Sequence, residues 1–448
     1  MEMRGCKCYT VAMVDEPESL VAELVEFLEA SQTENTSRQS RPMLYNTYEL
    51  RRRAAAPAFR LAGIQSHMLR SVPWGDSLPI RSMRAMTETV AALEVTHRHP
   101  PFKIESVSID GNEVPVHEET IASTPFGTLL RFVKAGEFDQ PRILIVAALA
   151  GHFATLLRGT IRTLLPDHDV FLAEWHNARD VPTAAGNFGL DEYIEHLMDF
   201  LNEIGPGTHL MAVCQPCPLA VAAGSLMAED EHHAQPASLI LLAGPIDARI
   251  NPGPVNAFAT KRSLKSLERS VITRVPRPYK GAGRKVYPGF LQAIGFISLA
   301  PERHLRAFAG LAIDIARGSD AAAARTKEFY EEYLSVLDVT AEFYLETAAA
   351  IFKNHDLARG KMAWRGRRVN PGAIETALLT IEGENDELCP PGQTRAAHDL
   401  CTGIPADRKR HLLQAGVGHY GVFNGTRFDR ETYPVIREFV AANDRAIA

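Results

Sequence analysis

The chain has few cysteines, little net charge and no long apolar run, and each shortage excludes a class of protein. Six cysteines in 448 residues are too few for the disulfide framework of a small secreted scaffold. A net charge of −6 at pH 7 provides no single-sign field of the kind that nucleic-acid-binding proteins carry. The longest apolar stretch, Ile143 to Leu157, is interrupted by His152 and is shorter than the ~18 residues that a membrane helix needs, so no membrane span is expected.

The N-terminus also lacks the apolar stretch of a secretory signal. We therefore expect a cytoplasmic protein whose thiols are reduced. A composition of 46% hydrophobic and 23% charged residues is ordinary for a globular protein with a sizeable core. The length indicates either one large domain with an insertion or two domains.

Apolar patterning divides the chain into four parts. We predict that residues 1–42 form a flexible N-terminal extension, because residues 31–42 are polar and show no apolar periodicity. Within this extension, residues 18–30 could form a short amphipathic helix. A helical segment from Met43 to about Leu93 is followed by strands that alternate with helices. Asp110-Gly111-Asn112 predicts a hairpin turn between the first two strands. The expected strands lie at 104–109, 114–116, 143–148, 170–175, 209–213, 238–243, 377–382 and 411–414.

This alternation predicts an α/β fold with a mostly parallel sheet. Its core would consist of residues 43–250, which include the helical N-terminal segment, and residues 373–448. Residues 251–372 break the alternation and contain aromatic helical stretches, which predicts an inserted, largely helical cap. Such a cap would cover the carboxyl edge of the sheet, where open α/β sheets bind ligands.

The segment around Cys214 has the form of a nucleophile elbow. An apolar strand at 209–213 leads directly into a helix rich in small residues, a turn that exposes a nucleophile above the sheet. The usual Gly-x-Ser-x-Gly is here Ala212-Val-Cys-Gln-Pro216, in which alanine is small and proline suits the start of a helix. The positive end of the helix dipole favours the thiolate. We therefore predict that Cys214 is a catalytic nucleophile.

An acid and a histidine follow in the order that this kind of site requires. Asp386 lies in an acidic loop after the strand at 377–382, and His419 stands between glycines after the strand at 411–414. His419 would take the thiol proton and later activate water, while Asp386 would orient the imidazole. The acidic loop also offers other carboxylates, namely Glu382, Glu384 and Glu387.

Two backbone N–H groups should form an oxyanion hole. We predict that one comes from Gln215, which follows the nucleophile, and the other from the loop Gly151-His152-Phe153 after the strand at 143–148. The alternative interpretation of His152 is a polar side chain near the edge of the sheet whose hydrogen bonds are satisfied and which takes no part in a site.

Several further motifs compete with this interpretation. The Cys-x-x-Cys spacing that ends at Cys217 matches a redox pattern, and adding His398 and Cys401 would give a zinc set with loose spacing. The Gly-x-Gly-x-x-Gly at 416–421 has no βαβ unit after it, which argues against dinucleotide binding. The stretch around Ser77 resembles the serine motif of GDSL-type hydrolases, but Ser77 follows no apolar strand. The sequence therefore predicts neither a cofactor nor a metal.

Longer stretches carry a resemblance to a known family. They include Val213-Cys-Gln-Pro216 and Gly416-Val-Gly-His-Tyr-Gly-Val-Phe-Asn-Gly425, with others at 151–160, 244–249, 286–292, 328–334 and 405–409. From residue 43 to the C-terminus the chain resembles the intracellular polyhydroxyalkanoate (polyhydroxybutyrate) depolymerases. The resemblance implies an α/β-hydrolase with a cap, and a carboxylic ester hydrolase with the triad Cys214, Asp386 and His419.

The same resemblance implies a partner and a location. The substrate would be amorphous storage polyester at the surface of cytoplasmic granules, cleaved to hydroxyacid or oligomers. Water or CoA could be the acceptor, and a homodimer is left open. The nearest rival is a polymer synthase, although its expected Gly-x-Cys-x-Gly box is absent. A non-catalytic granule-coat protein would leave the triad unexplained.

Overall fold

The computed structural model describes residues 41–299 and 301–444. The predicted flexible extension lies outside the described residues, apart from its last two. These two, Arg41 and Pro42, belong to helix α2 (Arg41–Ser71).

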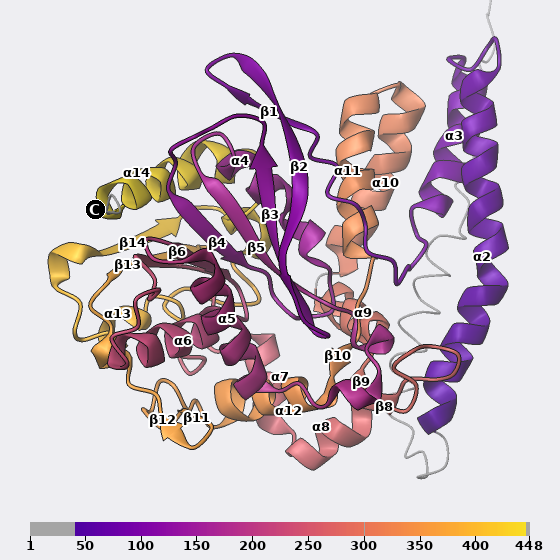
Figure 1. The fold of residues 1–448 in the computed structure, drawn as a ribbon. Coiled ribbons are helices and arrows are strands. Elements are labelled where there is room, and N and C mark those ends of the chain that lie inside the picture. Colours follow the sequence, from indigo (N-terminus) through magenta and orange to yellow (C-terminus); the bar gives the residue numbers. More distant parts are fainter. Residues whose placement is uncertain (1–40, 300, 445–448) are drawn as a thin grey trace, which may run out of the picture. The chain divides into compact units, whose positions relative to one another are not determined.

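A nine-stranded sheet lies at the centre of the described chain (Figure 1). The strand order is β1-β2-β3-β5-β4-β6-β7-β13-β14. Strands β1 to β3 pair antiparallel, as do β3 and β5, and every pair from β5 to β14 is parallel. This confirms the predicted α/β fold with a mostly parallel sheet. The bounds are β1 (Ser106–Ile109), β2 (Asn112–Ser123), β3 (Gly127–Lys134), β4 (Arg142–Val146), β5 (Asp169–Trp175), β6 (His209–Val213), β7 (Ser238–Leu242), β13 (Ala377–Gly383) and β14 (Lys409–Gln414).

Strand β3 is the core strand that the apolar pattern did not predict. Arg131 and Lys134 interrupt its apolar run, so its sequence lacks the signal of a buried strand. The structure accommodates both charges through partners on other elements. Arg131 pairs with Asp169 on β5 at 2.9 Å, and Lys134 donates a hydrogen bond to the carbonyl of Leu165 at 2.8 Å.

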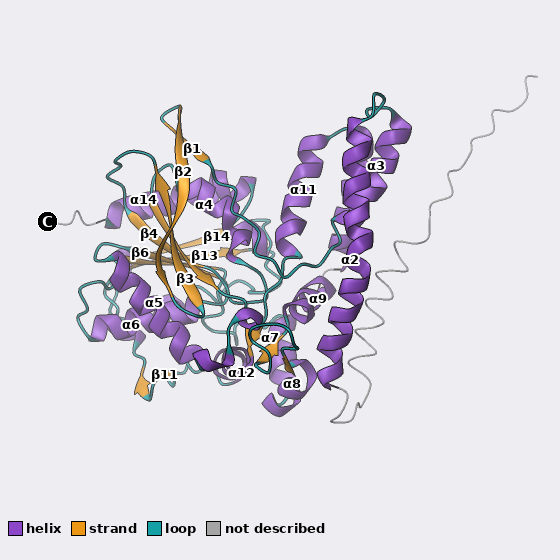
Figure 2. Cartoon of the chain, turned by 45° about the vertical axis from the view of Figure 1, so that its right-hand side comes forward, coloured by secondary structure: helices purple, strands orange, loops and turns teal. Residues whose placement is uncertain are grey.

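Helices cover both faces of the sheet, as Figures 1 and 2 show. Apolar residues of α4 (Arg158–Leu164) and α14 (Tyr433–Asn443) pack on one face, and those of α5 (Leu190–Ile204) and α6 (Cys217–Glu229) pack on the other. Because β4 lies between β5 and β6, the connections that leave β4 and β5 run to opposite sides of it. The carboxyl ends of β4 and β6 therefore border a topological switch point, the usual ligand position in such sheets.

The insertion predicted at 251–372 is largely helical but also contains small sheets. Three short strands pair as β10-β9-β8, and a further hairpin joins β11 to β12. Their isolated two- and three-residue lengths give no periodic signal in the sequence. The cap as a separate unit stays a prediction, as do the two core segments. The elements are α7 (Pro254–Lys261), α8 (Leu264–Val271), β8 (Thr273–Arg274), β9 (Lys285–Tyr287), α9 (Gly289–Leu299), α10 (Pro301–Arg317), α11 (Asp320–Tyr333), β10 (Val339–Thr340), α12 (Ala341–Thr347), β11 (Ala363–Trp364) and β12 (Arg367–Arg368).

The N-terminal helical segment forms two helices, α2 and α3 (Leu78–Ala91), separated by a turn at 72–77. The Tyr45 hydroxyl donates a hydrogen bond to the buried Asp338 carboxylate at 2.6 Å, which fixes the start of α2 to the segment before α12. Helix α3 packs against α10 through Ala85 and Leu311. Among the described residues, no helix combines the length and the apolar character needed to cross a bilayer.

Candidate active site

Cys214 lies in the turn between β6 and α6, as predicted. Its backbone is in the left-handed region, with φ of 69°, a conformation that costs a non-glycine residue about 1–3 kcal/mol. The Cys214 N–H donates to Leu242 of β7 at 2.8 Å, and the Cys214 carbonyl accepts the N–H of Cys217 at 3.1 Å. The turn is therefore held in the sharp conformation that an elbow needs, and Cys214 is half-buried at the end of its strand.

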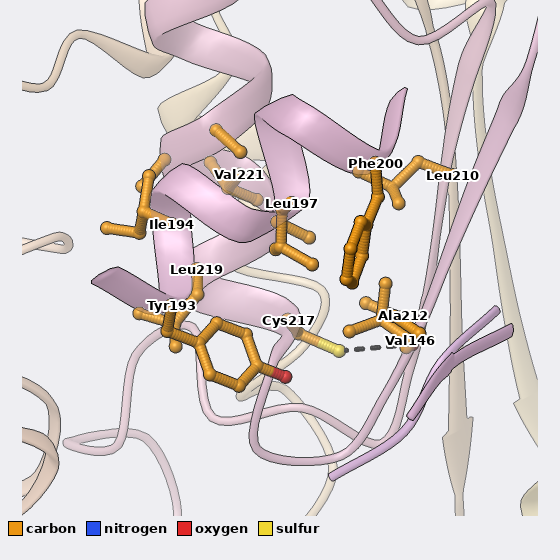
Figure 3. Packing of buried hydrophobic residues seen from close by; sticks show 14 of the residues in the cluster. Val146, Tyr193, Ile194, Leu197, Phe200, Leu210, Ala212, Cys217, Leu219 and Val221 are labelled. Atoms are coloured by element: carbon orange, nitrogen blue, oxygen red, sulfur yellow. Dashed lines mark hydrogen bonds between the residues drawn. The ribbon is translucent and has the colours of Figure 1, made fainter. Parts of the chain in front are cut away.

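The second cysteine of the Cys-x-x-Cys pattern has a different environment. Cys217 is completely buried in the apolar cluster between β6 and α5, and its thiol donates to the carbonyl of Ala212 at 3.3 Å (Figure 3). Burial raises the pKa of the Cys217 thiol well above its ordinary value. Both cysteines are free thiols in the structure. Cys217 is therefore a packing residue, with neither the access nor the charge of a nucleophile.

Gly244 makes room for the elbow, a role that the sequence did not reveal. A Cβ at this position would lie 2.2 Å from Sγ of Cys217 and 2.8 Å from the carbonyl oxygen of Cys214. Both distances are far inside van der Waals contact, so β7 can approach the elbow only with glycine here.

The variant Gly244→Ala is expected to lower the free energy of unfolding by about 1–3 kcal/mol, because it overpacks a filled site. Urea denaturation measures this difference. The matched control is Gly310→Ala in α10, where an added Cβ meets no atom within 4 Å. That variant should be neutral or stabilised, since alanine is the better helix former. Equal stability of the Gly244 variant and the wild type would contradict the packing argument.

Asp386, which follows β13, and His419, which follows β14, form a buried pair. The Nδ1–H of His419 donates to Oδ2 of Asp386 at 2.8 Å, and both side chains are almost completely buried. The other carboxylate oxygen of Asp386 accepts the N–H groups of Leu388 and Cys389 at 2.9 and 2.8 Å. Asp386 is thus fixed in place, and Nε2 is the ring nitrogen of His419 left for a reaction.

Backbone hydrogen bonds join the loop that carries Asp386 to the loop that carries His419. The Asn385 N–H donates to the carbonyl of Val417 at 2.9 Å, and the Glu384 carboxylate accepts the N–H of Gly416 at 2.7 Å. Gly383 allows this approach, because a Cβ there would lie 2.6 Å from the Val417 carbonyl oxygen. The acid and the histidine are consequently positioned by the backbone on both sides of the pair.

The rival carboxylates of the acidic loop have other partners. Glu382 is buried and accepts three backbone N–H groups, from Gly392, Thr394 and Arg395. Glu387 forms an ion pair with Arg303 at 3.4 Å. Of the four carboxylates considered, Asp386 is the one that accepts a hydrogen bond from Nδ1–H of His419.

The electrostatics of His419 favour its protonated form. Burial alone would lower its pKa, but the Asp386 carboxylate and the Cys214 thiol, through charge and hydrogen bonding, raise the pKa of His419 well above its ordinary value. The raised pKa makes the neutral imidazole of His419 a stronger base toward the thiol proton of Cys214. The structure therefore brings the three predicted residues into one electrostatic unit, whose catalytic role stays a prediction.

The elbow is also tied to the predicted oxyanion loop. Oε1 of Gln215 accepts the N–H of Leu149 at 3.1 Å, a side-chain role that sequence reasoning missed. The Gln215 N–H, by contrast, donates to no other group within the described part of the chain, so it is available to a developing oxyanion.

The loop Gly151-His152-Phe153 is anchored to the segment that follows α11. The Gly151 carbonyl accepts the N–H of Leu337 at 2.9 Å, and His152 forms a β-bridge with Val336. Gly151 has φ of 87°, and a Cβ there would lie 2.8 Å from Gln292, so the position requires glycine. Its contribution to an oxyanion hole stays a prediction.

The His152 ring is buried between aromatic rings. Its centroid lies 4.8 Å from that of Tyr333 and 5.6 Å from that of Phe296. Burial lowers the pKa of His152 to about 4, which leaves the ring neutral. The side chain therefore packs against α9 and α11 and carries no charge into the site.

Two of the competing motifs, at Ser77 and His398, do not join the site, whereas the glycine motif does. Ser77 is exposed and precedes the first residue of α3, and the His398 ring hydrogen-bonds with Thr380 at 2.8 Å. The glycines at 416–421 form the loop that carries His419.

A pocket of about 310 Å³ opens beside the triad. Tyr420, which follows His419, and Glu387 and Leu388, which follow Asp386, form one wall. The opposite wall comes from α9, α10 and α11 and is largely aromatic. Its lining residues are Phe296, Leu299, Arg303, His304, Ala307, Arg325, Thr326, Phe329, Tyr330 and Tyr333.

Comparisons with known proteins show which proteins this chain is similar to. Residues 243–444 match the model of the family described as PHB de-polymerase C-terminus. The chain is also similar to the poly(3-hydroxyalkanoate) polymerase subunit PhaC of Haloferax mediterranei, with 21% identity over 317 residues. That match covers 68% of this chain and 59% of the relative, so the chain spans less than two thirds of the relative's length.

Among solved structures, the chain is similar to a hydrolase from Pseudomonas aeruginosa, with 14% identity and a TM-score of 0.42, over 75% of this chain and 100% of the other. It is also similar to a thermophilic esterase from Thermogutta terrifontis, with 15% identity and a TM-score of 0.39, over 76% and 98% of the two chains. The sheet topology is that of an α/β-hydrolase, and the family match over 243–444 together with the similarity to PhaC supports a polyhydroxyalkanoate-related α/β-hydrolase family.

Proposed function

We propose that the protein hydrolyses the ester bonds of amorphous poly(3-hydroxybutyrate), or of related short-chain polyhydroxyalkanoates, to hydroxyacid or oligomers. The observation that carries the proposal is the buried Asp386–His419 pair, electrostatically linked to Cys214 at the same edge of the sheet. This combination is what a cysteine acyl transferase needs.

The reaction has two steps. Nε2 of His419 takes the proton of the Cys214 thiol, and Sγ attacks the ester carbonyl carbon while the N–H of Gln215 stabilises the oxyanion. The carbon–oxygen bond of the ester then breaks, and the leaving alkoxide takes the proton from His419 to become a hydroxyl end. In the second step His419 deprotonates water, which attacks the thioester, releases a carboxylic acid and restores the thiol.

The surroundings of the triad suit an apolar polyester. The aromatic wall of the neighbouring pocket can pack against methyl-branched units, and its tyrosine hydroxyls can donate hydrogen bonds to ester carbonyls. A family match over 243–444 supports the same substrate class.

The insoluble polymer is also the partner that we propose for the exposed apolar residues of α2 and α3. Leu61, Ile64 and Met68 follow one stripe of α2, and Trp74 at the turn is 77% exposed. The exposed Arg60 adjoins Leu61 in this stripe, and its positive charge complements the carboxylate ends present at a polyester surface. Location at polyester granules is thus part of the proposal.

The test is product release from amorphous poly(3-hydroxybutyrate) granules, with and without CoA. Release of free hydroxybutyrate or its oligomers without CoA is the expected result. Release that depends on CoA would replace water by CoA as the acceptor. Granule binding with no release under either condition would contradict the proposal and favour a coat protein.

The similarity to a polymerase subunit supports a second candidate, polymer synthesis from hydroxyacyl-CoA through the same triad. Incubation with 3-hydroxybutyryl-CoA separates the two activities. A synthase would release CoA and form polymer, whereas the hydrolase that we propose would form no polymer.

A further inference from the structure

The pocket beside the triad contains charges that a neutral polyester does not require. Arg303, Arg325 and Glu387 are among its lining residues. Arg303 and Glu387 neutralise each other as an ion pair at 3.4 Å. Arg325 is exposed and forms no ion pair with any residue that the structure describes. The pocket therefore has an apolar aromatic wall and one uncompensated positive charge.

A polyhydroxyalkanoate chain has one group that matches such a charge. Every ester unit is neutral, but each chain and each linear oligomer ends in a free carboxylate. A guanidinium binds a carboxylate with two parallel hydrogen bonds and remains charged at any physiological pH. The aromatic wall would at the same time contact the aliphatic part of the terminal units.

We propose that this pocket is the leaving-group subsite of the reaction and that Arg325 binds the terminal carboxylate of the polyester. This inference rests on the proposed ester hydrolysis and specifies its direction. The carboxyl-terminal unit or units are the alcohol side of the ester that is cleaved. They leave with a new hydroxyl group and their original carboxylate, while the rest of the chain becomes the acyl group on Cys214.

Over a full turnover, one ester bond is hydrolysed and the Cys214 thiol is restored. The Cys214 thioester forms as the ester bond breaks, and water then hydrolyses the thioester to a free carboxylate at the shortened chain. Each turnover therefore regenerates the group that Arg325 recognises, so the enzyme would shorten a chain repeatedly from its carboxyl end.

The test compares two soluble substrates, the linear trimer of 3-hydroxybutyrate as the free acid and as its methyl ester. The wild type is expected to show a kcat/KM about fivefold higher for the free acid, the effect of one exposed charge pair. This preference should fall as NaCl is added, because salt screens an exposed charge. The variant Arg325→Gln should lose the preference, with the free-acid rate falling more than the methyl-ester rate.

The matched control is Arg306→Gln in α10. Arg306 is 79% exposed, pairs with Glu302 within its own helix and does not line the pocket. This variant should keep both rates and their ratio. Equal rates on the two substrates in the wild type, or an unchanged ratio in Arg325→Gln, would overturn the proposal. Failure to hydrolyse either substrate would instead refute the proposed hydrolysis itself.

Discussion

Replacing Cys214 by alanine is expected to lower kcat/KM for polyester hydrolysis by at least about 10⁴-fold, because removing the nucleophile of a triad costs on that scale. The remaining oxyanion donor and His419 could then only assist direct attack by water. Release of 3-hydroxybutyrate from amorphous granules, and of alcohol from a soluble hydroxybutyrate ester, measures the loss. The fold should be unchanged, since Cys214 is half-buried at a turn and not part of the tightly packed core.

Cys217→Ala is the control for this variant. Its thiol is buried against Ala212 and α5, so the substitution should lower stability modestly and leave the chemistry in place. Undiminished hydrolysis by Cys214→Ala, or loss in the Cys217 variant alone, would show that the nucleophile is elsewhere.

The second large effect is expected for Asp386→Asn, with a loss of about 10³–10⁴-fold. The asparagine amide can donate to Nδ1 of His419, which would place the histidine proton on Nε2, the nitrogen that must accept the thiol proton. The change also removes the carboxylate charge that helps to raise the pKa of His419. The pKa of His419 should therefore fall, and NMR titration of the histidine ring measures that shift directly.

An exposed aspartate provides the matched control. Asp399→Asn in α13 (Ala397–Leu400) makes the same chemical change outside the site and should leave both the activity and the His419 titration unaltered. Normal activity in Asp386→Asn would mean that the acid of the site is another carboxylate.

The strands that carry the candidate site could be predicted because their signals are local. Strand β6 is buried at every position and apolar at its last four, 210–213, and its predicted bounds agree with the structure. Cys214, Asp386 and His419 follow β6, β13 and β14, in that order along the chain. The carboxyl ends of these parallel strands lie at one edge of the sheet, so the three residues could be expected to lie together. Where strands bury both faces, a continuous apolar run is sufficient to identify them.

The features that the sequence did not reveal depend on contacts between distant segments. Gly244 matters because β7 approaches Cys217, and Gln215 because its side chain meets the strand end at Leu149. The charged pocket joins Arg325 of α11 to residues that follow Asp386 and His419. No periodicity in any one segment encodes such approaches, so only a three-dimensional structure brings them out.

Cys214 is expected to become acylated during turnover, and the mass of the trapped intermediate measures this directly. The enzyme is mixed with a soluble 3-hydroxybutyrate ester, quenched in acid at early times, digested and mapped by mass spectrometry. We expect a 3-hydroxybutyryl group on Cys214 in the peptide that contains it, with Cys217 unmodified. An acyl group on another side chain, or steady hydrolysis with an unmodified Cys214 under conditions that accumulate the intermediate, would contradict it.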